Sequence, residues 1–264
     1  MYKIHEICLA NTNSLFELAK INNLLFKFNS KGFQNPWIME SHKFQSSDKV
    51  LDVGGGYSKL PPYIQKETGC EVWVADDFGH SDGIDWGRFD NPKVLVEKNP
   101  GIKYVMELVG NKDRSSLPDN YFDVVYSVSV LEHVSYDFTP LVWKHMADLV
   151  KPGGKLIHSV EFYFPSNLGW FNLLMIALLE RVPSLLPKRI MRKLLHRSPA
   201  AYTWLVYKTL GIKKGIPKNL YALNFVIDPE IMVEGYEMGW KRIVKDGLDY
   251  HHRRLGVLLL HIEK

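Results

Sequence analysis

Cysteine is scarce in this sequence: Cys8 and Cys70 are the only two among 264 residues. They lie far apart and form no Cys-x-x-Cys pair, which excludes a disulfide framework and a cysteine-based zinc site. The first residues also lack a basic segment followed by an apolar core, so we expect no secretion signal. These absences favour a protein of the reducing cytoplasm.

Long hydrophobic runs are also missing. The most apolar stretch covers residues 168–179 and ends at Glu180, whereas a membrane span needs roughly 20 residues. Repeats and low-complexity tracts are absent as well. Because 46% of the residues are hydrophobic and 23% are charged, the chain is expected to fold around a real core rather than to be fibrous or disordered.

One segment lacks acidic residues. Between Arg181 and Lys218 there are ten Lys and Arg residues and no Asp or Glu, although the whole chain has a net charge of only +4. The rest of the chain is therefore acidic, with a net charge of −6. Such a concentration of positive charge indicates an anionic partner, or else a solvated cationic helix face.

Short apolar runs alternate with helical patterns in the middle of the chain. This alternation predicts an α/β fold, with a mostly parallel, Rossmann-like sheet covered by helices on both faces. Seven strands are expected, at residues 49–53, 71–75, 103–109, 122–127, 155–159, 240–244 and 255–263.

Four regions follow from the same patterns. Residues 1–48 are expected to form an N-terminal helical cap, and residues 49–161 the core. Residues 162–228 are rich in Leu, Lys and Arg and are interrupted by prolines, which predicts a basic helical insertion that covers the substrate. Residues 229–264 are expected to add a helix and the last two strands of the core.

A glycine-rich turn follows the first predicted strand. Gly54, Gly55 and Gly56 allow the backbone to turn sharply and to approach a ligand closely. An NAD-type loop would need a third spaced glycine at position 59, where this sequence has Lys59.

The run VLDVGGGYS at residues 50–58 resembles the first motif of class I S-adenosylmethionine-dependent methyltransferases, (L/V)DxGxGxG, with Ser58 at the third glycine position. Residues 113–134 are similar to the pattern DxxxLPxxxxxFDxVxSxxVLEHV, which is found in small-molecule methyltransferases such as those for quinones, sterols and sugars. KPGGKL at residues 151–156 matches the turn before strand five. The chain is thus identified as a member of this family, with S-adenosylmethionine as cofactor and S-adenosylhomocysteine as product.

The resemblance implies a role for each motif residue. The loop, with Asp52 before it, would line the methionine and ribose portions of the cofactor. Asp76 and Asp77 follow the second strand, where a carboxylate can accept hydrogen bonds from both ribose hydroxyls. The carboxylate of Asp113 would accept from the adenine amino group. The backbone of Arg114 would lie beside the adenine. The carbonyl of Ser127 would accept a hydrogen bond from the ammonium group of the cofactor.

Candidate bases for deprotonating an acceptor are histidines. His133 is the first choice, because it follows strand four at the carboxyl edge of the sheet, where ligands of open α/β folds bind. His158 is the second, although a mid-strand side chain can equally point into the core. His251 and His252 lie in a predicted loop. No metal is expected, since Glu132 and His133 alone do not make an octahedral oxygen site.

The acceptor is open to several interpretations. A phosphorylated or nucleotide-linked sugar, or an anionic glycan, would suit a basic lid with aromatic rings, and would predict cytoplasmic O-methylation in carbohydrate biosynthesis. A membrane surface contacted through residues 168–218 would instead suit a lipid or quinone. Nucleic acid is disfavoured, because no recognition module is present. The non-enzymatic alternative is a methyltransferase-like subunit that binds the cofactor, or has lost it, and serves as a scaffold.

Overall fold

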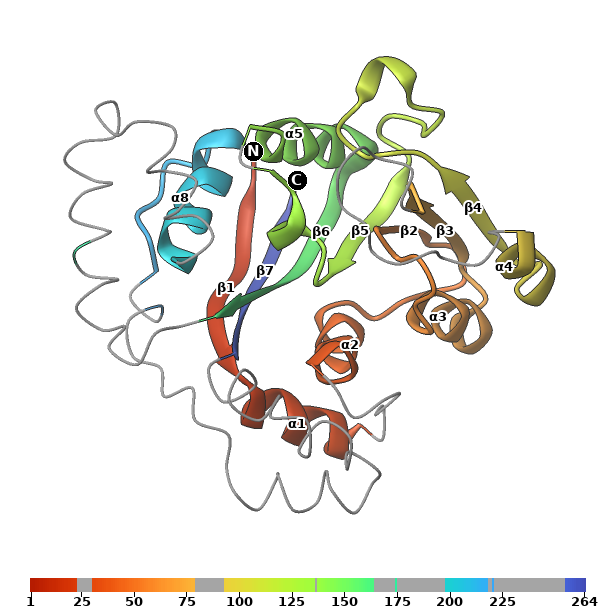
Figure 1. Cartoon of the computed structure of the whole chain (residues 1–264), viewed down its shortest axis with the longest axis horizontal. Helices are drawn as coiled ribbons and strands as arrows, with labels where there is room; N and C mark the ends of the chain where they lie inside the picture. The colour runs from red at the N-terminus through yellow and green to blue at the C-terminus, as the bar shows by residue number, and fades with distance from the viewer. Residues whose placement is uncertain are drawn as a thin grey trace.

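The computed structural model describes residues 1–22, 30–78, 93–135, 137–163, 174, 198–217, 220 and 255–264. Its centre is a seven-stranded sheet in the order β1-β7-β6-β5-β2-β3-β4 (Figure 1). The strands from β2 to β6 run parallel, whereas β7 is antiparallel to both of its neighbours. The α/β, Rossmann-like prediction is therefore confirmed. The strands are β1 (Lys3–Asn11), β2 (Lys49–Val53), β3 (Glu71–Asp76), β4 (Ile102–Met106), β5 (Phe122–Val128), β6 (Val150–Tyr163) and β7 (Leu255–Glu263).

Helices cover both faces of this sheet, and each face has its own apolar core. One core joins the sheet to α5 and α8 and includes Leu51 and Val53 of β2. The other joins it to α1, α2 and α3 and includes Val50. This alternation along β2 follows from the opposite directions of successive side chains in a strand. The helices are α1 (Thr12–Ile21), α2 (Ser30–Ser41), α3 (Leu60–Thr68), α4 (Lys93–Lys98), α5 (Thr139–Leu149) and α8 (Pro199–Thr209), with short 3-10 turns η1 (Lys112–Arg114) and η2 (Leu131–His133).

The N-terminus supplies an edge strand, so the predicted helical cap over residues 1–48 is wrong for residues 3–11. Strand β1 pairs antiparallel with β7 along its length, with a bulge at His5. Ile7 and Leu9 point into the core on the α5 side, which is the period of two expected for a strand. The predicted strand at residues 240–244 lies outside the described residues.

Strand β6 is longer than predicted, because it begins at Val150, includes the residues of the predicted turn, 151–154, and ends at Tyr163. Between β5 and β6 the register shifts from the pair Phe122 and Val150 to the pair Val124 and Lys155. The extra residues of β6 therefore form an irregularity at the start of the strand. Gly153, with φ +78°, allows the backbone to make this detour.

Helix α8 belongs to the core, which corrects part of the predicted lid. Tyr202 and Tyr207 on this helix are each 4% exposed, and the Trp143 indole N–H donates to the Tyr202 hydroxyl over 3.0 Å. Two of the aromatic rings expected in the predicted lid therefore do not face an acceptor, because they pack between α8, α5 and the sheet. In the part of the chain that the structure describes, no helix is long and apolar enough to span a membrane.

A carboxylate at the amino edge of the sheet gathers three donors. The Glu71 carboxylate, at the start of β3, accepts hydrogen bonds from Lys103 Nζ (2.9 Å), the Trp73 indole (2.6 Å) and the Tyr121 hydroxyl (2.9 Å). Partial burial opposes ionisation, but the three donors prevail and lower the pKa of Glu71 to about 2. Glu71 thus links β3 to β4 and to the residue just before β5.

We predict that the Glu71→Gln variant loses a pH-dependent part of its stability. A lowered pKa in the folded state stabilises the protein above the ordinary value of 4.5, and this contribution disappears as the pH falls through about 2. Because the side chain is 33% exposed, screening by water limits the effect at pH 7 to on the order of 1 kcal/mol.

Urea unfolding followed by circular dichroism between pH 7 and pH 2 measures this contribution. Glu67→Gln, on the exposed side of α3, is the matched control and should follow the parent protein. If Glu71→Gln and the parent show the same pH dependence between pH 4.5 and pH 2, the three hydrogen bonds do not contribute as described.

Candidate functional site

The glycine loop between β2 and α3 has no room for side chains. Gly54 adopts φ +71° and Gly56 adopts φ +46°, and both values favour glycine. A Cβ on Gly54 would lie 2.5 Å from Cγ1 of Val130, and one on Gly55 would lie 2.5 Å from the Asp52 carboxylate. The bare backbone therefore packs directly on the segment after β5, and leaves the kind of surface that a ligand can approach closely.

The start of α3 indicates a ligand without phosphate. Dinucleotide-binding loops hold a pyrophosphate with the free N–H groups of the following helix. Here the Leu60 N–H donates to the Ser58 hydroxyl over 3.2 Å, Pro61 and Pro62 have no N–H, and the Tyr63 N–H donates to the Lys59 carbonyl over 3.2 Å. No backbone N–H of residues 60–63 is left for a phosphate, which fits a nucleoside cofactor such as S-adenosylmethionine.

The Ser58 hydroxyl has a local role in the same turn. Besides accepting from Leu60, Ser58 donates its own N–H to the Gly55 carbonyl over 2.7 Å. The departure from the third glycine of the motif is therefore accommodated without loss of the turn.

Asp76 is at the rim of the loop, at the end of β3. Its Oδ1 accepts the Phe78 N–H over 2.7 Å, and its Oδ2 is 3.2 Å from the position that a Cβ on Gly56 would occupy. Asp77 follows it and is half-buried. The carboxylate next to the bare backbone is placed as a ribose-binding residue would need to be, so the residues present fit the nucleoside.

Asp52 lies beneath the loop rather than at its surface. The side chain is 2% exposed, and it pairs in register with Tyr126 of β5. Burial and the neighbouring Asp52 charge raise the pKa of Tyr126. The structure thus places Asp52 where it supports the glycine loop from below.

Asp113 occupies η1, beyond the edge strand β4, and is exposed. The turn after η1 is held by Glu107, which the sequence analysis did not single out. The Glu107 carboxylate accepts from the Ser115 hydroxyl and from the Ser116 N–H over 2.8 Å. The position of Glu107 just after a strand could have marked it as a turn residue. Its partners lie eight and nine residues later, a separation that no sequence pattern indicates.

Ser127 and His158 lie together in the core. The Ser127 hydroxyl and His158 Nδ1 are 2.9 Å apart, and neither residue is exposed. The Trp143 ring packs edge-on against His158, with the ring centroids 5.0 Å apart. Burial lowers the pKa of His158 to about 3. The structure therefore places His158 away from any acceptor, with its ring held as a neutral core group.

His133 ends η2 and its side chain is 44% exposed. Its Nε2 lies 3.9 Å from the Glu132 carboxylate, which is 12% exposed. Glu132 Oε1 in turn accepts the N–H of Glu161 on β6 over 3.3 Å. Of the histidines proposed as bases, His133 is at the carboxyl edge and accessible, whereas His251 and His252 lie outside the described residues.

A buried polar cluster links α2 to the ends of β5 and β6. Gln34 is fully buried, and its carbonyl oxygen accepts from the hydroxyls of Ser129 (3.1 Å) and Ser159 (2.6 Å). Its amide nitrogen donates to the Glu161 carboxylate over 2.8 Å. Sequence patterns did not reveal this cluster, because its members are brought together from three separate elements.

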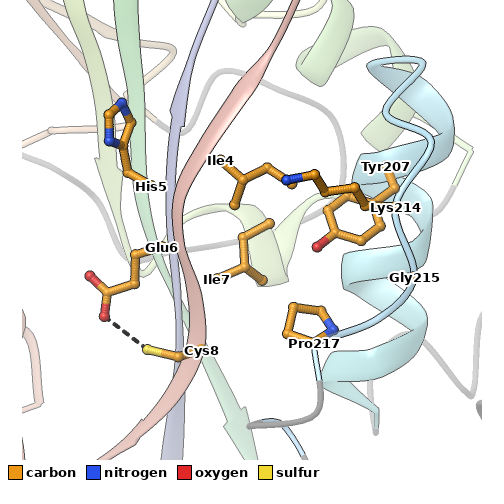
Figure 2. Close-up of a pocket in the computed structure, with 9 residues that line it drawn as sticks. All are labelled: Ile4, His5, Glu6, Ile7, Cys8, Tyr207, Lys214, Gly215 and Pro217. Carbon is orange, nitrogen blue, oxygen red and sulfur yellow. Dashed lines mark hydrogen bonds between the residues drawn. The ribbon is translucent and has the colours of Figure 1, made fainter.

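A groove of about 590 Å³ follows the edge strand β1. Figure 2 shows Ile4 and Ile7 facing Tyr207 and Lys214, while Glu6 lies on the other side of the strand. Because β1 is separated from β2 by three strands, this groove lies away from the glycine loop. Among the described residues, no group of three or more His, Cys, Asp or Glu side chains could hold a metal ion.

Comparison with known proteins agrees with this geometry. The family model described as a methyltransferase domain matches residues 20–200, more than half of the chain. The ubiquinone/menaquinone biosynthesis C-methyltransferase UbiE of Neisseria meningitidis is 25% identical over 252 residues, which cover 92% of this chain and 86% of that protein. Phosphoethanolamine N-methyltransferase 1 of Zea mays is 29% identical over 123 residues, or 46% of this chain and 22% of that protein.

A solved structure shows the same fold. The geranyl diphosphate C-methyltransferase of Streptomyces coelicolor, in complex with Mg²⁺, geranyl diphosphate and S-adenosyl-L-homocysteine, aligns with a TM-score of 0.51 and 9% identity, over 99% of this chain and 89% of that one. The chain belongs to the methyltransferase-domain family and is a class I S-adenosylmethionine-dependent methyltransferase.

Proposed function

We propose that the cofactor lies along the carboxyl edge of β4, β3, β2 and β5. The observation that supports this placement is the position of the Asp76 carboxylate beside the bare backbone, 3.2 Å from where a Cβ on Gly56 would lie. With the ribose at Asp76 and the adenine toward Asp113 beyond β4, the amino-acid half extends to β2 and β5. That end is bordered by Gly54 and Val130 and by the carbonyl of Ser127.

We propose further that the methyl acceptor is an aromatic quinol, methylated on a ring carbon. The similarity to UbiE over 92% of the chain supports this acceptor. Neither of the two relatives compared is named an O-methyltransferase, so the O-methylation of a sugar expected from the composition has no support from them. The quinone alternative takes its place.

The bound cofactor would supply an electrophilic methyl group, and the chain's own residues would orient it and remove a proton. The loop and Asp76 would fix the orientation of the cofactor, and such positioning contributes roughly 7–11 kcal/mol to catalysis in favourable cases. His133 would take the hydroxyl proton of the quinol, which makes the ring carbon a better nucleophile. The proton displaced from that carbon would then pass to solvent, and the proton held by His133 would return to the ring oxygen of the product.

A peripheral location at the cytoplasmic side of a membrane would suit such an acceptor. Lys208, Lys213 and Lys214 are exposed in the described part of the basic segment. Each basic residue near an anionic leaflet adds about 1 kcal/mol to its attraction. The apolar residues 168–179, apart from the exposed Leu174, lie outside the described residues.

We expect the Gly54→Ala variant to lose cofactor binding. The new methyl group would meet Val130 and would sit on a backbone with positive φ. S-adenosylhomocysteine at about 100 times its dissociation constant should stabilise the parent protein by about 2.7 kcal/mol. It should not change the stability of the variant, and thermal unfolding with and without the ligand measures both.

Gly211→Ala is the matched control for this substitution. Gly211 has a similar φ of +68°, but nothing lies within 4 Å of its Cβ position. It should therefore keep the full response to the ligand. A parent protein that shows no response at any ligand concentration would favour the scaffold alternative over the enzyme.

Asp76→Asn tests the ribose contact. The amide oxygen can still accept from Phe78, so the turn should persist, but the charge that strengthens two hydroxyl contacts is lost. We expect the dissociation constant of S-adenosylhomocysteine, measured by calorimetry, to rise about tenfold or more. An unchanged constant would remove Asp76 from the binding site.

His133→Ala tests the proposed base. A methyl-transfer screen over quinols, nucleotide sugars and glycans should give turnover with a quinol. In the variant, kcat should then fall by roughly 10²–10⁴-fold, while S-adenosylhomocysteine binds as in the parent. Full activity would exclude His133 as base, and turnover confined to sugars would refute the quinol proposal.

A further inference from the structure

Helix α2 reaches the carboxyl ends of β5 and β6, where the Gln34 side chain holds it by hydrogen bonds. In Figure 1 it lies just beyond the end of β5. The Gln34 amide spans the two strands: its oxygen accepts from Ser129, just after β5, and from Ser159 on β6, while its nitrogen donates to Glu161. All of these contacts are 3.1 Å or shorter.

Ser129 is held in an unfavourable backbone conformation. Its φ is +51°, in the left-handed region that costs a non-glycine residue free energy unless its surroundings enforce it. Two contacts enforce it here: the Ser129 N–H donates to the Ser159 carbonyl over 3.0 Å, and its hydroxyl donates to Gln34. Gln34 therefore helps to maintain the turn that ends β5.

The next residue transmits this turn to the glycine loop. Val130 packs against Gly54 so closely that its methyl group fills the space where a Cβ would be. The peptide groups between Ser127 and Val130 thus border the glycine loop on the β5 side. A change in the backbone of Ser129 would move Val130 and this border together.

We infer that Gln34 is a positioning residue for the amino-acid half of the cofactor. This inference rests on the cofactor placement proposed above. Gln34 acts on the β5 side of the crevice through Ser129 and Val130, whereas the ribose is assigned to Asp76 on β3, two strands from β5. The N-terminal helix α2 thereby tunes one half of the cofactor site and leaves the nucleoside half alone.

Two ligands distinguish the halves. S-adenosylhomocysteine contains both, and 5′-methylthioadenosine has the nucleoside and sulfur but no amino-acid group. In the Gln34→Met variant, which keeps the length of the side chain but loses its hydrogen bonds, the dissociation constant of S-adenosylhomocysteine should rise about tenfold. That of 5′-methylthioadenosine should stay within about twofold. Both constants are measured by calorimetry on the full chain.

Ser129→Ala is a second, smaller perturbation of the same link, and should give the same pattern even if Gln34→Met does not fold. The double variant should bind no more weakly than Gln34→Met, because both changes break one path. Trp37→Phe is the control for α2 itself, since it removes a different side-chain hydrogen bond of this helix, that of the indole to Glu6 over 3.1 Å. It should leave both constants unchanged.

Several outcomes would overturn the inference. Gln34 does not position the amino-acid half if Gln34→Met and Ser129→Ala weaken the binding of both ligands equally, or if they weaken the binding of neither. Asp76→Asn should weaken the binding of both ligands alike. If it weakens the binding of neither, the proposed cofactor placement fails and the role of Gln34 fails with it. If it weakens both as expected, a failed test of Gln34 leaves the cofactor placement intact.

Discussion

The close contact between the backbone of Gly54 and the side chain of Val130 is the constraint around which the site is built. It joins the ends of the neighbouring strands β2 and β5, and it requires a residue without a side chain and with φ +71° at position 54. The glycine loop is therefore fixed on its β5 side before any ligand arrives. Asp76 then lies on the other side of the loop, at the end of β3.

The chemistry of the ligand follows from what surrounds this contact. The first turn of α3 offers no free N–H, because Ser58 and Lys59 accept two of them and Pro61 and Pro62 have none. A carboxylate and bare backbone remain, which suit a nucleoside with ribose hydroxyls and no phosphate. The same type of loop can thus serve different cofactors, and the residues after it decide which one.

The N-terminal segment is part of the methyltransferase core rather than an addition to it. Strand β1 completes one edge of the sheet beside β7, and α2 is tied both to β1 through Trp37 and Glu6 and to β5 and β6 through Gln34. These two side chains lie one turn apart in the middle of α2 and hold the helix near the carboxyl edge of the sheet.

The local sequence determined the strands from β2 to β6, the glycine loop and its acidic partner, because each depends on residues that are close together in the chain. The tertiary structure decided the rest. Whether His158 faces an acceptor or the core depends on Trp143 and α8, which lie far from it in sequence. Residues 3–11 form strand β1, which the sequence did not predict, because its pairing with β7 joins opposite ends of the chain. Gln34 meets Ser129 and Ser159 after 95 and 125 residues, and no local pattern encodes a contact over such a separation.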